Sequence, residues 1–207
     1  LQKIDNPHLK LPPIIHIAGT NGKGSTLSYL RQIMMENKFL VHAYISPHLK
    51  SFNERIIIAN KEIATSKLLY NLQYIKKVNN GNPITFFEIT TAVAFYLFSK
   101  QKADFLILET GLGGRLDATN VIKNSLINII TPIDIDHQEY LGKSIKKITN
   151  EKLGIIKKYS NIIIGKQKKI VTAHIKEKIK KKKNIKIYYG NQFKIIKRNS
   201  KKFTLQY

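Results

Sequence analysis

The segment HIAGTNGKGST, residues 16–26, constrains the fold more than any other part of the chain. It places three glycines and one lysine within six positions, directly after an apolar run that predicts a buried strand at residues 13–18. Residues 24–37 follow with helical spacing of their apolar side chains, which are Leu27, Leu30, Ile33 and Met34. A loop that ends a strand and opens a helix offers free backbone N–H groups and the positive end of the helix dipole to an anion. The segment therefore predicts a strand, a phosphate-binding loop and a helix in that order.

Apolar runs and helical patterns alternate along the rest of the chain. The further expected strands cover residues 39–45, 103–109, 126–131 and 161–164. The further expected helices cover residues 67–78, 85–98, 145–156 and 170–182, and residues 185–189 and 193–207 are β-like. Strands that alternate with helices predict an α/β fold, with a mostly parallel sheet and helices on both faces. Ligands in such sheets bind at the carboxyl ends of the strands.

The composition excludes several classes of protein. The 207 residues are 43% hydrophobic, which is enough to fill a core, and they include no cysteine. The absence of cysteine and of a signal-peptide pattern disfavours a disulfide-stapled secreted protein. The longest apolar stretch, residues 89–98, is far shorter than the roughly 20 residues of a membrane-spanning helix. We expect a cytoplasmic, monomeric protein without a membrane partner.

The formal net charge of +23 is concentrated near the C-terminal end of the sequence. Between residues 166 and 202, Glu177 is the only acid among many lysines. Such a segment can bind nucleic acid through its phosphates. No interleaving of aromatic and basic residues accompanies the charge, so we interpret the lysines as solvated faces of the protein.

The loop departs from the strict G-x-x-x-x-G-K-[ST] pattern, because Gly24 follows Lys23 and Ile17 stands where the first glycine belongs. We interpret it as a variant phosphate loop. Glycines allow phosphate oxygens to approach the backbone closely, and Lys23 can reach the β- and γ-phosphates. A glycine-rich turn without a ligand is the alternative interpretation.

Polar residues follow several of the expected strands. Glu109 ends the buried run ADFLILE and is expected to face the phosphate loop, where an acid can help to hold Mg²⁺. His137, in ITPIDIDHQEYLG, can reach the same edge of the sheet and complete a metal site. Either residue alone is more often structural. The segment GLGGRLDATN adds three glycines together with Arg115, Asp117 and Asn120. The segment SPHLKSFNERI adds Ser46, His48, Asn53, Glu54 and Arg55.

Five segments occur in a characteristic order: HIAGTNGKGST, SPHLKSFNERI, TFFEITT, ETGLGGRLDATNV and DHQEYLGKSIKKITNEKLGIIK. Together they resemble the folylpolyglutamate synthase/dihydrofolate synthase family of the Mur ligase superfamily, over about residues 6–158. The resemblance implies the central ATPase domain of these ligases, with its P-loop-type sheet. Residues beyond 158 fit the later part of that domain only loosely.

The resemblance implies an ATP-dependent ligase of folate metabolism, with ATP and Mg²⁺ as cofactors. Such an enzyme joins L-glutamate to dihydropteroate or to a folate (poly)glutamate through an acyl phosphate. The implied ATP contacts are Asn21, Gly22, Lys23, Gly24 and, in a supporting role, Ser25. The implied metal ligands are Ser46, Glu109 and His137. The implied pterin or folate contacts are Thr85, Phe86, Phe87, Glu88, Leu116, Asp117 and Ala118. Lys23, His137 and Lys152 are the implied catalytic residues.

Lys152 has a further implied role. The lysine at the matching position of the family's EK-x-GI segment reacts with CO₂ to form a carbamate, which is an anionic oxygen ligand suited to Mg²⁺. Only the neutral amine adds CO₂, so burial and the nearby cation of Lys23 would favour the reaction by lowering the pKa of Lys152. Without the resemblance, Lys152 is an ordinary surface lysine of a helix.

The chain also departs from the family pattern. Family members have a pterin-contacting segment ahead of the phosphate loop. After the point where this chain stops, they have an HQ…N segment, a nucleotide-contacting arginine and a Rossmann-type domain that brings glutamate. We therefore expect residues 1–207 to form one Mur-ligase-like ATP-binding domain, incomplete at both ends and without the C-terminal domain, that binds Mg·ATP with little turnover.

Alternatives remain open. One is an ATP-binding remnant without ligase activity, and another is a basic nucleic-acid-binding module. A P-loop phosphohydrolase or switch would need a strict Walker A pattern and N-K-x-D, and the sequence has neither.

Overall fold

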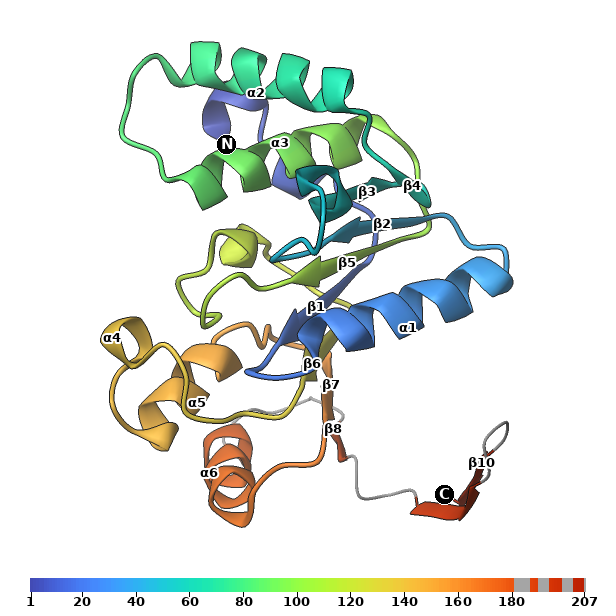
Figure 1. Ribbon diagram of the computed structural model, residues 1–207. Coiled ribbons are helices and arrows are strands. Elements are labelled where there is room, and N and C mark those ends of the chain that lie inside the picture. The colour runs from blue at the N-terminus through green and yellow to red at the C-terminus, as the bar shows by residue number, and fades with distance from the viewer. Residues whose placement is uncertain (181–186, 190–193, 199–202, 207) are drawn as a thin grey trace.

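The computed structural model describes residues 1–180, 187–189, 194–198 and 203–206, and its main element is a mostly parallel sheet (Figure 1). The eight strands of this sheet are β1 (Ile14–Ala18), β2 (Val41–Tyr44), β3 (Ile56–Ile58), β4 (Lys61–Glu62), β5 (Phe105–Glu109), β6 (Ile127–Ile130), β7 (Asn161–Ile164) and β8 (Ile187–Tyr189). Their order is β4-β3-β2-β5-β1-β6-β7-β8, in which only β3 and β4 run antiparallel to their neighbours. A separate antiparallel pair is formed by β9 (Lys194–Arg198) and β10 (Phe203–Gln206).

Helices cover both faces of the sheet, as predicted. They are α1 (Lys23–Glu36), α2 (Thr65–Asn79), α3 (Phe86–Lys100), α4 (Gln138–Leu141), α5 (Ile145–Leu153) and α6 (Lys169–Lys180). Four short 3₁₀ helices accompany them: η1 (Gln2–Ile4), η2 (Pro7–Leu9), η3 (Phe52–Arg55) and η4 (Ala118–Val121). Helix α1 lies on one side of the sheet, whereas α3, α5 and α6 lie on the other side (Figure 1). None of the described helices has the length and apolar content that crossing a membrane requires.

The alternation of side chains along β1 explains the two layers. Ile15 and Ile17 point toward α1 and pack with its buried Leu27. Ile14 points to the opposite face and packs in the cluster that contains α3. All five residues of β1 are buried, because the strand lies between β5 and β6 and is covered on both faces. The central position of β1 therefore fixes where the following loop emerges.

Most of the predicted elements are present within a few residues of their expected bounds, and the strand at residues 161–164 matches. The strands expected at residues 13–18, 39–45, 103–109 and 126–131 are each shorter in the structure. The helix expected at residues 145–156 ends at Leu153, and Gly154 then packs against the backbone of Arg115. Residues 181–186, 193, 199–202 and 207 of the later expected segments lie outside the described residues.

Two features of the fold were not predicted. The strands β3 and β4 were missed, and Ala59 and Asn60 form a tight turn between them with positive φ angles. The run Ile56–Ile58 is only three residues long, which is too short for a periodic pattern to show. In α1, the side chain of Ile33 is 60% exposed, whereas that of Leu27 is fully buried against the sheet.

Candidate functional site

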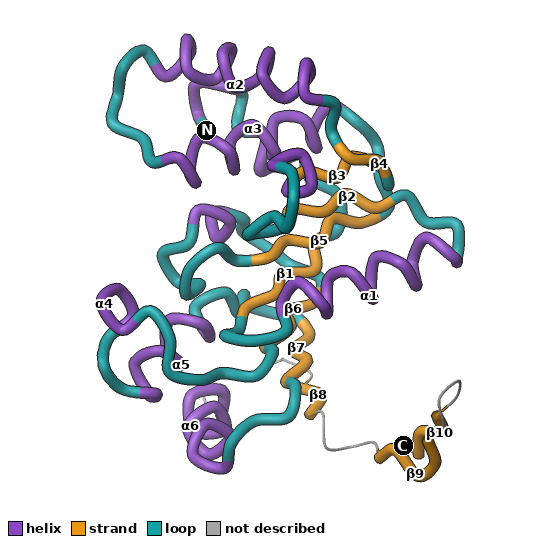
Figure 2. The backbone as a smooth tube through the Cα atoms, viewed as in Figure 1, coloured by secondary structure: helices purple, strands orange, loops and turns teal. Residues whose placement is uncertain are grey.

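The loops that follow β1, β2, β5 and β6 meet at one edge of the sheet (Figure 2). These strands are parallel neighbours, so their carboxyl ends point the same way. This arrangement brings together segments that are up to about a hundred residues apart in the sequence. The edge is the place where ligands of such sheets bind.

The phosphate loop enters α1 through a glycine N-cap. Gly22 has φ 80°, in the left-handed region that favours glycine, and no side chain caps the first turn of α1. The first N–H groups of the helix therefore remain available for an anion. The hydroxyl of Thr26 donates to the carbonyl of Gly22 over 2.7 Å and holds the loop against the helix.

The loop is also attached to the segment after β6. The N–H groups of Thr20 and Asn21 both donate to the carbonyl oxygen of Pro132, over 3.0 and 3.1 Å. The hydroxyl of Thr20 accepts from the N–H of Asp134 and donates to its carbonyl, at 3.0 Å each. A Cβ at position 19 would lie 1.8 Å from Oγ1 of Thr131, so only glycine fits there.

A cavity of about 750 Å³ opens over this loop. All of the predicted ATP contacts line it, together with two of the predicted metal ligands: Asn21, Gly22, Lys23, Gly24, Ser25, Ser46 and Glu109. A Cβ at Gly24 would lie 3.7 Å from Oε2 of Glu109, so the first turn of α1 is adjacent to the carboxylate. The structure thus brings together the predicted phosphate loop and the predicted metal-binding acid.

Glu109 and Ser46 form the polar wall of this cavity. The N–H of Ser46 donates to Oε2 of Glu109 over 3.2 Å. Burial raises the pKa of Glu109 to about 6, against the opposing effects of that hydrogen bond and of the cations Lys23 and Arg55. The Ser46 hydroxyl is buried and has no hydrogen-bond partner among the described residues. An unpartnered hydroxyl beside a buried carboxylate fits a hard cation such as Mg²⁺, which prefers oxygen ligands.

The described residues contain no group of three histidine, cysteine or acidic side chains that meet at one point. Side chains of the described residues alone would thus supply only part of the coordination shell of Mg²⁺. Mg²⁺ usually keeps several waters and binds substrate phosphates, so a partial shell from Ser46 and Glu109 is compatible with it.

Lys152 is buried beneath the phosphate loop. Its Nζ donates to the carbonyl oxygen of Gly19 over 2.9 Å, a contact that the sequence did not predict. Burial and, to a lesser extent, the cation of Lys23 lower the pKa of Lys152 to about 8, while Asp136 opposes the shift. The expected burial and the expected effect of Lys23 are thus both present. At this pKa, a substantial fraction of the amine is neutral near physiological pH.

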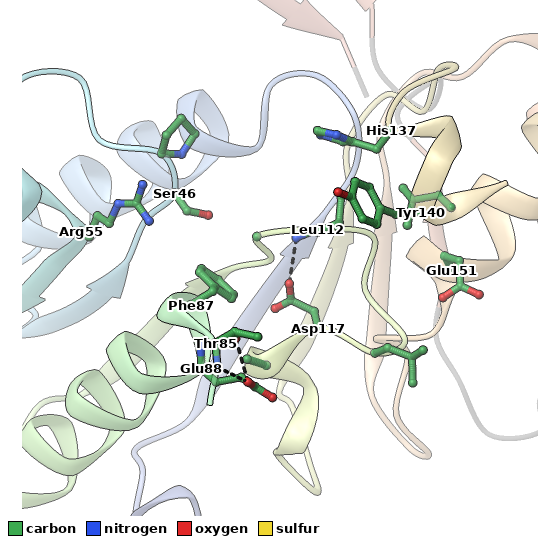
Figure 3. A pocket seen from close by; sticks show the side chains of 15 residues that line it. Ser46, Arg55, Thr85, Phe87, Glu88, Leu112, Asp117, His137, Tyr140 and Glu151 are labelled. Carbon is green, nitrogen blue, oxygen red and sulfur yellow. Dashed lines mark hydrogen bonds between the residues drawn. The ribbon is translucent and has the colours of Figure 1, made fainter. Parts of the chain in front are cut away.

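A second cavity, of about 730 Å³, adjoins the first and shares Ser46 and Pro47 with it. Most of the predicted pterin contacts line it: Thr85, Phe87, Glu88, Leu116, Asp117 and Ala118. His137 lines it as well, and its ring extends from the β6 loop toward the side on which Ser46 lies (Figure 3). Lining residues that the sequence did not indicate are Leu112, Tyr140, Leu141 and Glu151.

The segment TFFE lies at the start of α3, where part of it serves the helix. The carboxylate of Glu88 accepts from the N–H of Thr85 over 2.8 Å, and the hydroxyl of Thr85 accepts from the N–H of Glu88 over 3.2 Å, which makes a capping box (Figure 3). Phe86 does not line the cavity: it is 64% exposed, and its ring packs edge-on against Phe52. Its placement therefore differs from the predicted role as a ligand contact.

Asp117 fixes the glycine-rich loop after β5. It accepts from the N–H of Leu112 over 2.8 Å (Figure 3) and from the N–H and hydroxyl of Thr119 over 3.0 and 2.6 Å. The hydroxyl of Thr119 also meets Nε2 of His16 at 2.9 Å. Burial lowers the pKa of His16 to about 3, so its ring is neutral. Because the Thr119 hydroxyl donates its proton to Asp117, it accepts from Nε2 of His16. The central strand β1 is thereby connected to the floor of the second cavity.

Some polar residues of the segment SPHLKSFNERI stabilise the local fold, and others line the cavities. Glu54 accepts from the N–H groups of Leu49, Lys50 and Ser51 and so closes the turn before η3. Asn53 donates to the carbonyl of Ile63. Arg55 faces the second cavity, and its Nε donates to Nδ1 of His48 over 3.0 Å.

Known proteins of this architecture share both the sequence and the fold. Residues 17–206 match the family described as Mur ligase middle domain. The dihydrofolate synthase/folylpolyglutamate synthase of Haemophilus influenzae is 40% identical over 164 residues, which are 79% of this chain and 37% of that protein. An FPGS–AMPPCP complex superposes with a TM-score of 0.90 at 28% identity, over 99% of this chain and 53% of that one. The E. coli FolC complex with DHPP and ADP superposes with a TM-score of 0.82 at 28% identity, over 100% of this chain and 50% of that one. The chain thus spans about half or less of these proteins.

The raised pKa of Glu109 predicts a pH dependence of stability. Protonation of a group whose pKa is raised by folding stabilises the folded state at low pH, and this stabilisation is lost as the pH rises from the ordinary value of 4.5 through about 6. We expect the free energy of unfolding of the parent, relative to Glu109→Gln, to fall by about 1–2 kcal/mol between pH 4.5 and pH 7. Urea unfolding of both proteins at the two pH values measures the difference. A constant difference would contradict the burial of this carboxylate.

Proposed function

Because the chain belongs to the Mur ligase family, among the folylpolyglutamate and dihydrofolate synthases, we propose that it binds Mg·ATP and a pteroate or folate as part of an ATP-dependent ligase. The reaction joins L-glutamate to the carboxyl group of that substrate. The observation that carries the proposal is the pair of adjoining cavities that share Ser46. One cavity has the phosphate loop and Glu109, and the other has the pterin-type contacts.

The two cavities suit a reaction between a nucleotide and a carboxylate. A carboxylate oxygen of the acyl substrate attacks the γ-phosphorus of ATP, the bond to the β-phosphate oxygen breaks, and ADP leaves. The amine of L-glutamate then attacks the acyl carbon of the resulting acyl phosphate, inorganic phosphate leaves, and the amine loses a proton. Phosphoryl transfer of this kind depends mainly on positioning and on charge neutralisation.

The described residues support distinct roles in this reaction. The N–H groups of Gly22 and Gly24 would bind the phosphates, with Asn21 and Ser25 beside them, and Lys23 would neutralise charge on the transferred group. Ser46, Glu109 and His137 would hold Mg²⁺, which supplies charge neutralisation at the phosphate oxygens when bound. Known relatives support the nucleotide assignment, since one is a complex with AMPPCP and another with ADP. The pterin contacts remain Thr85, Phe87, Glu88, Leu116, Asp117 and Ala118.

Substitutions at the phosphate loop and the metal wall test the nucleotide site. We expect Lys23→Ala and Glu109→Ala each to weaken binding of Mg·ATP by about 1.5–3 kcal/mol, because each removes a charge-assisted contact. Isothermal titration calorimetry at fixed Mg²⁺ measures the loss, with Lys50→Ala as a control on an exposed cation of the loop after β2. If either variant binds as tightly as the parent, the role given to that residue is wrong.

Isotope transfer tests the reaction itself. Dihydropteroate labelled with ¹⁸O in its carboxyl group should pass one ¹⁸O to inorganic phosphate when ATP and L-glutamate are present, because the attacking oxygen stays on phosphorus. Mass spectrometry of the phosphate measures this, and Lys23→Ala serves as the control that abolishes it. Amide formation with unlabelled phosphate would exclude the acyl phosphate. Because residues 1–207 are expected to show little turnover, only a complete absence of glutamate-dependent ADP release, with ATP still bound, would favour the alternative of an ATP-binding module.

Lys152 is the third element of the proposal. We propose that its neutral amine adds CO₂ and forms a carbamate, which contributes anionic oxygens at the metal-facing side of the phosphate loop. The nitrogen of a carbamate retains one N–H, so the hydrogen bond to the carbonyl of Gly19 can persist after the modification. The burial of Lys152 and its pKa of about 8 both favour the addition.

Carbon-13 NMR detects the carbamate directly. The protein equilibrated with ¹³C-bicarbonate at mildly alkaline pH should show a slowly exchanging carbamate signal that disappears in Lys152→Arg. The matched control is Lys147→Arg, since Lys147 lies on the same helix. A folded sample with bound Mg·ATP and no such signal would leave Lys152 as a residue that only anchors the loop.

A further inference from the structure

Arg55 lies at the junction of the two cavities, and its guanidinium group is only partly used by the protein. Its side chain is half-buried and lines the second cavity on the same side as Ser46 (Figure 3). Nε donates to His48, but in the described part of the chain neither terminal nitrogen has a hydrogen-bond partner and no carboxylate lies within ion-pair distance. A guanidinium group offers five donors, so the two terminal nitrogens of Arg55 are available to a ligand.

The position of Arg55 is fixed by its neighbours. The guanidinium carbon lies 5.0 Å from the centre of the Phe52 ring, in a cation–π contact. His48 accepts from Nε and also meets the Phe52 ring at 5.6 Å. The Phe52 ring in turn packs against Phe86 at the start of α3. The contacts with the Phe52 ring and with His48 hold the guanidinium group of Arg55 in one orientation. Its two terminal nitrogens therefore point in a fixed direction, which favours recognition of an oxyanion.

The charge of the surroundings indicates which end of the substrate lies near Arg55. Arg55 lines the second cavity, which adjoins the nucleotide cavity at Ser46 and Pro47, and it does not line the nucleotide cavity itself. In the proposed function, the substrate carboxylate must approach the γ-phosphate past Glu109, and these three groups are all anionic. A cation at this point reduces their mutual repulsion.

From this arrangement we propose that Arg55 binds the reactive carboxylate of the acyl substrate through its two terminal nitrogens and so determines that the substrate is a carboxylic acid. The inference rests on the proposed function, and it gives a role to an arginine of the segment SPHLKSFNERI to which the resemblance assigned none. The paired N–H donors of an arginine match the two oxygens of a carboxylate. The γ-phosphate of ATP is the other oxyanion within reach. Because Arg55 does not line the nucleotide cavity, we assign it to the carboxylate.

The test compares an acid with its neutral analogue. Pteroate and the corresponding primary carboxamide are titrated into the parent protein, into Arg55→Gln and into the control Lys50→Gln, in which an exposed lysine of the same loop is changed. We expect the parent to prefer pteroate. Arg55→Gln should lose about tenfold or more in affinity for pteroate and less than twofold for the carboxamide, since only the charged contact is removed. Lys50→Gln should keep the preference.

Each other outcome overturns a defined part of the argument. Equal losses for both ligands in Arg55→Gln, or no loss for either, would overturn the inference while the proposed function stands. A loss of Mg·ATP affinity with an unchanged preference for pteroate would assign Arg55 to the nucleotide instead. If the parent binds neither ligand, the proposed function itself is wrong, and the inference falls with it. Arg55→Lys, with an unchanged urea unfolding curve, separates these effects from misfolding, because it keeps the charge and loses the paired donors.

Discussion

The close contact between Gly19 and the segment after β6 is the constraint on which the site depends. The backbone passes so near Thr131 that a side chain at position 19 would collide with its hydroxyl. The N–H groups of Thr20 and Asn21 then both donate to Pro132, and Lys152 holds the carbonyl of Gly19 from below. These contacts orient the entrance of α1, and with it the uncapped N–H groups of its first turn. A loop that is held on several sides in this way is ordered before the ligand binds.

The second feature of the site is its arrangement of charge. Burial shifts the pKa values of two groups in opposite directions. It raises the pKa of Glu109, which makes the carboxylate easier to protonate, and it lowers the pKa of Lys152, which makes the amine easier to deprotonate. Both shifts lower the charge that these two groups carry. A metal ion bound beside Glu109 would lower the pKa of its carboxylate again, because a nearby cation favours the ionised form. Ligand binding should therefore be linked to the release of a proton near neutral pH.

The sequence predicted the elements well and their contacts only in part. Apolar runs identified the strands that end at Ala18 and Glu109, because buried parallel strands have continuous apolar sequences. The motifs also placed Lys23 and Glu109 at one edge. The bond from Lys152 to Gly19 joins residues 133 positions apart, and it depends on the order of strands, which local patterns do not encode. The exposed position of Phe86 and the pairing of His48 with Arg55 depend likewise on how separate loops pack.

The order of the strands has a consequence for synthesis of the protein on the ribosome. Strand β1 is made early, yet both of its neighbours, β5 and β6, come about ninety residues or more later in the chain. Until residues 131–134 have been synthesised, the glycine-rich loop lacks the carbonyl of Pro132, which accepts from its N–H groups, and the side chain of Thr131, against which Gly19 packs. Contacts between residues so far apart in the sequence raise the contact order, which slows folding. The phosphate loop can therefore reach its final conformation only after residues 131–134 have been translated.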